Sequence, residues 1–284
     1  MKEFAGKTAV ITGGASGIGR AMAELFLAKG MNVVIGDIEQ SALDKTVAEL
    51  GGRGSCIGVK TDVSRAEDVQ ALADAALAEY GAIHVACNNA GVFAGGVLWE
   101  ESLADYEWQM GVNVWGVIHG IRTFVPIMQA QGDECHVVNT ASMAAVTAMP
   151  YSGIYHMTKH AVLALSESLY HELSFHAPNV KVSVLCPEAI NTGIAASERN
   201  RSAAGYAGEG DIVETGERDM VMQALADSTA SGLGPEVMAQ RVHDAIVDGR
   251  FYILSEEAWR EAANIRLDDV REGRNPTFAP PVSQ

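Results

Sequence analysis

The 284-residue sequence predicts a single-domain α/β protein, in which a parallel sheet is covered by helices on both faces. Short runs rich in β-branched residues alternate with longer runs of helical periodicity along most of the chain. A glycine-rich turn joins the first strand-like run to the first helical run. The chain has no linker that would divide it, and its 48% hydrophobic content is enough for one large core.

The first part of the chain alternates regularly between the two kinds of run. Strands separated by helices require right-handed crossovers, and these crossovers make the strands parallel. We expect strands at 8–11, 31–35, 56–60 and 83–87, and helices at about 22–29, 40–50 and 66–80.

The second part begins with one long helix, expected over 103–131. From 188 to 233 the pattern degrades into small, polar and glycine-rich residues with a helical patch at 213–226, as in a lid or binding loop. We expect further strands at 136–140, 181–186 and 251–254, and further helices at about 155–176, 235–248 and 256–271. The domain thus covers 1–273, and the proline-containing tail 274–284 is expected to be an arm or disordered.

The composition limits the partners and the compartment. A net charge of -16 disfavours nucleic acid and anionic membrane surfaces, because both would repel the protein. The sequence shows neither an apolar signal core nor a run long enough to span a bilayer, so we expect a cytoplasmic protein. Four scattered cysteines predict free thiols in a reducing compartment. We expect no metal site, because His156 and His160 lack an evident third ligand.

The glycine-rich turn predicts dinucleotide binding. Gly13, Gly17 and Gly19 follow a strand and open a helix, whose free N–H groups and dipole favour a pyrophosphate. Asp37 ends the second strand, where a carboxylate can bind the adenosine ribose and repel a 2′-phosphate. NAD is therefore favoured over NADP. Arg20 favours NADP if its cation neutralises a 2′-phosphate. Alternatively, Arg20 is simply a solvated helix residue.

A tyrosine and a lysine predict a catalytic base. Tyr155 and Lys159 are four positions apart and share one helix face, so the cation can stabilise the phenolate and lower its pKa. Ser142 lies at the end of the strand that precedes this helix, where parallel sheets bind ligands. Tyr151 is a weaker candidate, because the residue four positions after it is not a lysine.

Together these motifs resemble the short-chain dehydrogenase/reductase family over roughly residues 5–190. The resemblance implies a Rossmann-like sheet of about seven strands, an enzyme that uses NAD, and commonly a tetramer. It rests on the segments 12–19 and 88–91 and on Asn113, Ser142, Tyr155 and Lys159.

The resemblance also implies roles for these residues. Tyr155 would be the general acid/base, Lys159 would depress its pKa and hold the nicotinamide ribose, and Ser142 would bind the substrate oxygen. Asn113 would hold a water that links Lys159 to solvent. The implied cofactor-binding residues are Gly13, Ser16, Gly17, Ile18, Gly19, Asp37, Asp62, Val63, Asn89, Ala90, Gly91, Tyr155, Lys159, Pro187, Ile190 and Thr192.

Two positions keep alternatives. Asp62 either contacts the adenine or is a helix cap for the residues from Ser64 onwards. Glu188 replaces the glycine that the family has after the proline, and its side chain either enters the cleft and shapes substrate choice or turns out to water.

The substrate pocket is expected to be apolar, for a secondary alcohol or ketone, unless the same residues are ordinary core. Its expected residues are Ser142, Met143, Met149, Tyr151, Tyr155 and Glu188, with Phe93, the 188–233 loop and Trp99 at the rim. The carboxylates of Glu100, Glu101, Asp105 and Glu107 are predicted to be a solvated helix start capped by Ser102. The predicted function is hydride transfer between NAD and this small molecule in a homo-oligomer, either a dimer or a tetramer. The alternative is an NAD-binding sensor or scaffold without turnover.

Overall fold

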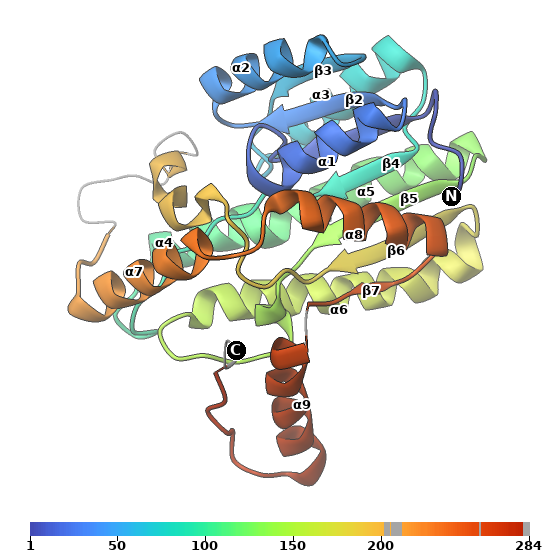
Figure 1. Ribbon diagram of the computed structural model, residues 1–284. Helices are drawn as coiled ribbons and strands as arrows, with labels where there is room; N and C mark the ends of the chain where they lie inside the picture. Colours follow the sequence, from blue (N-terminus) through green and yellow to red (C-terminus); the bar gives the residue numbers. More distant parts are fainter. Residues whose placement is uncertain (202–204, 206–211, 256, 281–284) are drawn as a thin grey trace.

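The predicted α/β fold is confirmed by the computed structural model, which describes residues 1–201, 205, 212–255 and 257–280 (Figure 1). The described strands form one parallel sheet in the order β3-β2-β1-β4-β5-β6-β7. They are β1 (Thr8–Thr12), β2 (Asn32–Asp37), β3 (Cys56–Lys60), β4 (Val85–Asn88), β5 (Cys135–Thr140), β6 (Val180–Leu185) and β7 (Tyr252–Ile253).

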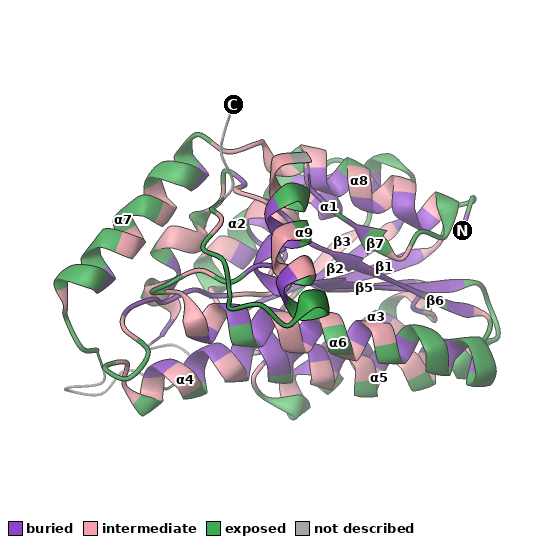
Figure 2. Cartoon of the chain, turned by 90° about the horizontal axis from the view of Figure 1, so that it is seen from below, coloured by how far each residue is buried: buried purple, intermediate pink, exposed green. Residues whose placement is uncertain are grey.

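Helices cover both faces of this sheet. In Figure 2, α1, α2 and α8 lie on one side of the sheet, and α3, α4, α5 and α6 lie on the other. The described α-helices are α1 (Gly17–Ala28), α2 (Gln40–Gly51), α3 (Ala66–Tyr80), α4 (Leu103–Met110), α5 (Gly116–Gln131), α6 (Gly153–His176), α7 (Gly216–Ala230), α8 (Pro235–Asp248) and α9 (Glu257–Glu272). None of the described helices is both long and apolar enough to cross a membrane.

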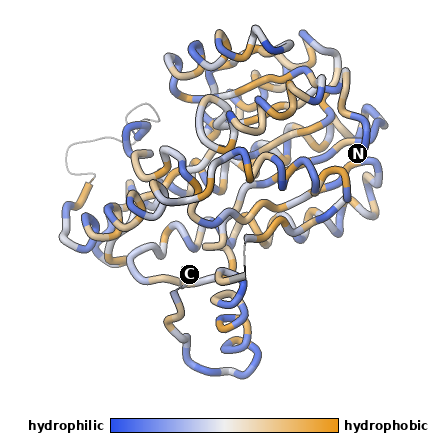
Figure 3. The backbone as a smooth tube through the Cα atoms, viewed as in Figure 1, coloured by the Kyte–Doolittle hydropathy of each residue, from blue (hydrophilic) through white to orange (hydrophobic). Residues whose placement is uncertain are grey.

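The core lies on both sides of the strands. Successive residues of β1 point to opposite faces, so Ile11 packs in the cluster beneath α1 and α8, whereas Val10 packs in the cluster beneath α3 and α5. Figure 3 shows the strands as mostly hydrophobic segments, and shows many hydrophilic residues in α9, which projects from the rest of the fold in Figure 1.

The helix predicted over 103–131 spans the expected residues but is not regular. Between α4 and α5, the five residues Gly111–Trp115 form a π-helical turn, and Asn113 lies in its middle. A π turn inserts one residue into the helical ladder, which turns the Asn113 side chain toward the segment that follows β4.

The irregular 188–233 loop is more ordered than the sequence suggested. It contains a 3₁₀ segment, η3 (Gly193–Asn200), and α7 begins three residues later than predicted, because the Thr215 side chain accepts from Arg218 N and caps it. Part of this loop, and the first residue of the helix predicted over 256–271, lie outside the described residues. In the described part of the tail, the backbone N–H of Thr277 donates to Asp269 of α9.

Gly120 sets how closely α5 approaches β4. A Cβ at this position would lie 1.8 Å from Oδ1 of the buried Asn88 side chain. We predict that Gly120→Ala lowers the free energy of unfolding by about 1–3 kcal/mol, because the overpacked helix must shift. Urea denaturation measures this. The control is Gly51→Ala in α2, where a Cβ meets nothing within 4 Å among the described residues. Equal stability of the two variants would contradict the prediction.

Candidate active site

A cleft of about 360 Å³ opens at the carboxyl ends of the strands. Its walls come from the loops that follow β1, β2, β4, β5 and β6, so residues far apart in sequence meet there. Most of the predicted site residues line it: Gly13, Ser16, Gly17, Ile18, Asp37, Asp62, Val63, Asn89, Ala90, Gly91, Ser142, Met149, Tyr155, Lys159, Pro187, Glu188, Ile190 and Thr192.

The glycine turn fits a dinucleotide phosphate. Gly13 and Gly17 have φ of +62° and +51°, which a side chain would strain. Gly19 does not line the cleft; a Cβ on it would lie 2.1 Å from the carbonyl oxygen of Gly13, so it permits the turn itself. Ser16 is the N-cap of α1 but makes no side-chain cap bond among the described residues. The first N–H groups of the helix therefore remain available to an anion.

The end of β2 carries the predicted ribose-binding carboxylate. Asp37 accepts from the N–H of Ala15 (3.0 Å) and of Glu39 (3.1 Å), so the backbone holds it at the cleft wall. Burial raises its pKa, while the two backbone bonds and Arg199 oppose this rise. Arg20, the cation that could neutralise a 2′-phosphate, forms ion pairs with Glu24 (3.0 Å) and Glu49 (2.7 Å) and does not line the cleft.

Asp62 caps the turn before α3 rather than the helix itself, whose N-cap is Arg65. Its Oδ1 accepts from the backbone N–H (3.0 Å) and the hydroxyl (2.7 Å) of Ser64. Asp62 also lines the cleft, so these hydrogen bonds hold it at the wall.

The turn after β4 is held against β1 by hydrogen bonds. Thr12 Oγ1 accepts from the backbone N–H of Asn89 (2.9 Å) and of Ala90 (3.1 Å).

Tyr155, Lys159 and Ser142 meet at one end of the cleft. The Nζ of Lys159 lies 5.5 Å from the centre of the Tyr155 ring and donates to the carbonyl of Thr140 at 3.1 Å. Lys159 is buried and forms no ion pair with the described carboxylates. The ring of Phe93 meets that of Tyr155 edge to face, with centroids 5.1 Å apart. The base, the cation and the serine thus share one partly apolar corner.

The predicted lowering of the Tyr155 pKa is wrong in this structure. Burial raises the pKa of Tyr155 to about 12, and a hydrogen bond with Ser142 opposes this only partly. Burial also lowers the pKa of Lys159 to about 8. Desolvation is therefore the main influence on both groups.

Asn113 is close to this corner but lies behind the cleft wall. Its Oδ1 accepts from Val92 N (2.9 Å), and its Nδ2 donates to Val92 O (3.0 Å) and Thr158 Oγ1 (3.1 Å). A Cβ on Gly91 would lie 3.4 Å from Lys159 Nζ and 3.5 Å from Asn113 Oδ1, so these two side chains flank the same glycine.

Two predicted substrate residues do not line the cleft. Met143 is 1% exposed and packs in a core cluster with Val162 and Val184. Tyr151 has φ of +60° and turns outward, with 37% of its surface exposed. Trp99, expected at the rim, is 85% exposed and also lies outside the lining.

Glu188, at the family's glycine position, is bound by a scaffold helix. Its carboxylate accepts from Arg241 of α8 at 3.1 Å, and its side chain is 7% exposed. Glu188 still contributes to the cleft lining, but it is neither solvated nor without a counter-charge.

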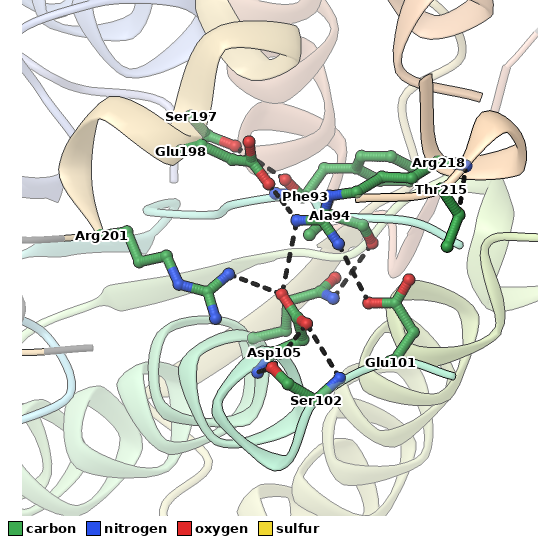
Figure 4. A network of polar contacts seen from close by, with 11 residues as sticks. Phe93, Ala94, Glu101, Ser102, Asp105, Ser197, Glu198, Arg201, Thr215 and Arg218 are labelled. Carbon is green, nitrogen blue, oxygen red and sulfur yellow. Dashed lines mark hydrogen bonds and ion pairs between the residues drawn. The ribbon is translucent and has the colours of Figure 1, made fainter. Parts of the chain in front are cut away.

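The prediction of a solvated helix start is wrong for two of its four carboxylates. Ser102 does cap α4, and Glu100 and Glu107 are exposed. However, the side chains of Glu101 and Asp105 are 4% and 0% exposed, because Arg218 and Arg201 bind them (Figure 4). Both arginines lie in the irregular 188–233 loop, about a hundred residues away in sequence.

Sequence reasoning missed other lining residues because the 188–233 loop lacks periodicity and α9 lies far along the chain. Arg199 of η3 pairs with Glu39, just beyond β2, at 2.8 Å, and both residues line the cleft. The other missed lining residues include Trp108, Ser197, Leu225, Thr229 and Trp259. Among the described residues, no group of three or more His, Cys, Asp or Glu side chains could hold a metal ion.

Comparisons with known proteins agree with this geometry. A model of the family described as short chain dehydrogenase matches residues 7–203. A relative from Streptomyces exfoliatus, named 1-deoxy-11-beta-hydroxypentalenate dehydrogenase, is 34% identical over 97% of this chain and 91% of its own. A second, from Lactiplantibacillus plantarum, is named CLA biosynthesis dehydrogenase/reductase and is 30% identical over 95% of each chain. The crystal structure of a short chain dehydrogenase/reductase from Burkholderia phymatum in complex with NAD is 45% identical, covers 100% of both chains and has a TM-score of 0.94.

The lowered pKa of Lys159 has a consequence for stability. Between about 8 and the ordinary value of 10.5, the unfolded chain binds more protons than the folded one, so this group makes stability rise with pH. Lys159→Met lacks this rise. We therefore predict that its free energy of unfolding falls relative to that of the wild type by up to about 3 kcal/mol between pH 7 and 10.5.

Urea denaturation of both proteins across this pH range measures the difference. Lys181→Met, at an exposed position of β6, is the control for the loss of a lysine. A constant difference between Lys159→Met and wild type would contradict a desolvated ammonium at this position.

Proposed function

The chain belongs to the short-chain dehydrogenase/reductase family and is an oxidoreductase, and from this premise we propose that it transfers a hydride between NAD and a secondary alcohol or ketone. One observation carries the proposal: the buried Lys159 ammonium lies beside the Tyr155 ring in the same cleft as the glycine turn. Strongly perturbed titratable groups that meet in a cleft are typical of catalytic sites.

The residues of the chain take separate roles in this proposal. Tyr155 is the general acid/base, and its hydroxyl exchanges a proton with the substrate oxygen. Ser142, which shares a hydrogen bond with Tyr155, binds that oxygen and orients it. Lys159 supplies a fixed positive charge that favours the phenolate form. NAD, when bound, supplies the group that accepts or gives the hydride.

Asn113 is proposed to support a proton path that runs from Tyr155 through Lys159 to solvent. Its amide fixes the segment after β4 and the hydroxyl of Thr158, which lies between Tyr155 and Lys159 on α6. Thr158 in turn donates to the carbonyl of Tyr155 at 2.8 Å. The water that the family resemblance assigns to Asn113 stays a proposal.

The choice of NAD over NADP rests on charge. Asp37 would repel a 2′-phosphate at the ribose position. Two cations near this end of the cleft are engaged, since Arg20 is bound by two glutamates and Arg199 pairs with Glu39. The related structure from Burkholderia phymatum, described in complex with NAD, supports the same choice.

The substrate is proposed to be largely apolar. The lining of the cleft includes Phe93, Met149, Leu225 and Trp259, and the Phe93 ring packs against Tyr155. The relative from Streptomyces exfoliatus is named for oxidation of a hydroxylated compound, which supports an alcohol substrate. A cytoplasmic location and a dimer or tetramer also stay proposals, in line with four free cysteines and an exposed Trp115.

The proposal is tested with a panel of secondary alcohols and ketones, hydroxysteroids included. Turnover is followed at the nicotinamide absorbance with NAD and NADP in parallel. We expect turnover of at least one apolar member, with NAD preferred. No absorbance change with any member would favour an NAD-binding sensor instead.

Tyr155→Phe tests the catalytic assignment. We predict that turnover falls by about 10²–10⁴-fold or more, because general acid/base catalysis typically supplies this factor. NAD affinity, measured by calorimetry, should stay close to that of wild type. The matched control is Tyr151→Phe, which changes the outward-facing tyrosine four residues earlier, before α6 begins. This variant should keep full turnover. Wild-type turnover by Tyr155→Phe would remove the assignment.

A further inference from the structure

Five charged side chains form a largely buried network beside the cleft, in which Glu198 is 31% exposed and the other four are at most 4% exposed (Figure 4). They come from three segments: Glu101 and Asp105 flank the start of α4, Glu198 lies in η3 and Arg201 directly follows it, and Arg218 lies in the first turn of α7. The side chains of Arg201 and Arg218 are 2% and 3% exposed, so water screens their charges little.

The arginines converge on one carboxylate. Asp105 Oδ1 accepts from Arg201 Nη1 at 2.5 Å and from Arg218 Nη2 at 3.4 Å, while its Oδ2 accepts from the N–H (3.1 Å) and the hydroxyl (2.7 Å) of Ser102. Arg218 also binds Glu101 at 3.4 Å and pairs with Glu198. The network therefore ties η3 and α7 to the start of α4.

The segments that it ties also form one wall of the cleft. On α7, Arg218, Val221, Leu225 and Thr229 follow one another at helical spacing, so they share a face. The last two line the cleft, one and two turns beyond Val221. In η3, Ser197 lines the cleft directly before Glu198 of the network.

This wall contacts the catalytic corner. The hydroxyl of Ser197 accepts from Phe93 N at 3.0 Å and donates to Phe93 O at 3.1 Å. The Phe93 ring in turn packs edge to face against Tyr155. A shift of η3 would therefore move Phe93 and the lining residues of η3 itself.

We propose that the buried network holds the η3–α7 wall against α4, and that Arg218 is thereby a positioning residue for the substrate. The inference rests on the proposed function for its kinetic part only. Removing one partner of a buried ion pair leaves the others uncompensated, so the wall should loosen without a change at Tyr155 itself.

Among the described residues of the network, three carboxylates face two guanidinium groups, so negative charge is in excess among them. Burial and the neighbouring Asp105 raise the pKa of Glu101 to about 7, against the opposing effect of Arg218 from α7 and Arg201 next to η3. Because the folded state binds the proton more tightly, the stability of the wall falls as the pH rises from about 4.5 through 7. Glu101→Gln removes the excess charge and with it this pH dependence.

The test uses the full chain and two readouts. The first is hydrogen–deuterium exchange of residues 193–201 and 216–230, corrected for the intrinsic effect of pH. We expect Arg218→Gln to raise exchange there about tenfold or more. We expect Glu101→Gln to exchange at pH 8 as slowly as wild type does at pH 6. The matched control is Arg250→Gln, which neutralises an exposed arginine paired with Asp248.

The second readout is kinetic. Arg218→Gln should raise KM for the alcohol about tenfold while kcat and NAD affinity stay within about twofold, and Arg218→Lys should recover part of the loss. If Arg218→Gln does not fold, the pH dependence of Glu101→Gln decides the matter.

Exchange in Arg218→Gln equal to that in Arg250→Gln overturns the proposal, as does wild-type pH dependence in Glu101→Gln. A fall in kcat with unchanged KM also overturns it. If wild type turns over no alcohol, the proposed function fails, and the exchange data alone decide on the wall.

Discussion

The site depends on one unfavourable arrangement, a buried ammonium held beside a tyrosine at the carboxyl edge of a parallel sheet. Lys159 and Tyr155 lie one turn apart on α6, and the end of β5 holds the ammonium through the carbonyl of Thr140. Burial removes water from the ammonium of Lys159 and disfavours its charged form, which lowers the pKa of Lys159. Such a group is retained where its charge acts on a ligand, and the sheet places the glycine turn of β1 in the same cleft.

The molecule holds its buried charges in two different ways. Arg201 and Arg218 are surrounded by carboxylates, so their charges stabilise the packing of the chain. Lys159 meets a carbonyl and a tyrosine ring, and no ion pair joins it to the described residues. In our proposal, the charges of Arg201 and Arg218 hold the η3–α7 wall in place. The charge of Lys159 acts on a molecule bound in the cleft. The two sets meet at Phe93, which contacts both Tyr155 and Ser197.

Local patterns were enough to predict the strands, most helices and the glycine turn that lines the cleft. The strand–glycine turn–helix at Gly13 and the Tyr155–Lys159 spacing are short-range signals that the fold only has to bring together. The buried state of Glu101 and Asp105 could not be predicted, because their partners come from a loop without periodicity about a hundred residues later. The raised pKa of Tyr155 was also missed, since spacing shows that a cation is near but not how much water the site excludes.

The central claim is our proposal that Tyr155 is the base of the site and that bound NAD, together with the Lys159 ammonium, lowers its pKa. Its pKa can be followed by NMR of a chain labelled with ¹³C at the tyrosine Cζ, with Tyr155→Phe to assign the signal. Without NAD we expect Tyr155 to titrate with a pKa near 12. With NAD bound we expect a pKa well below about 10, the ordinary value of a tyrosine. The same pKa in both states would contradict the claim that Lys159 and the filled cleft together stabilise the phenolate.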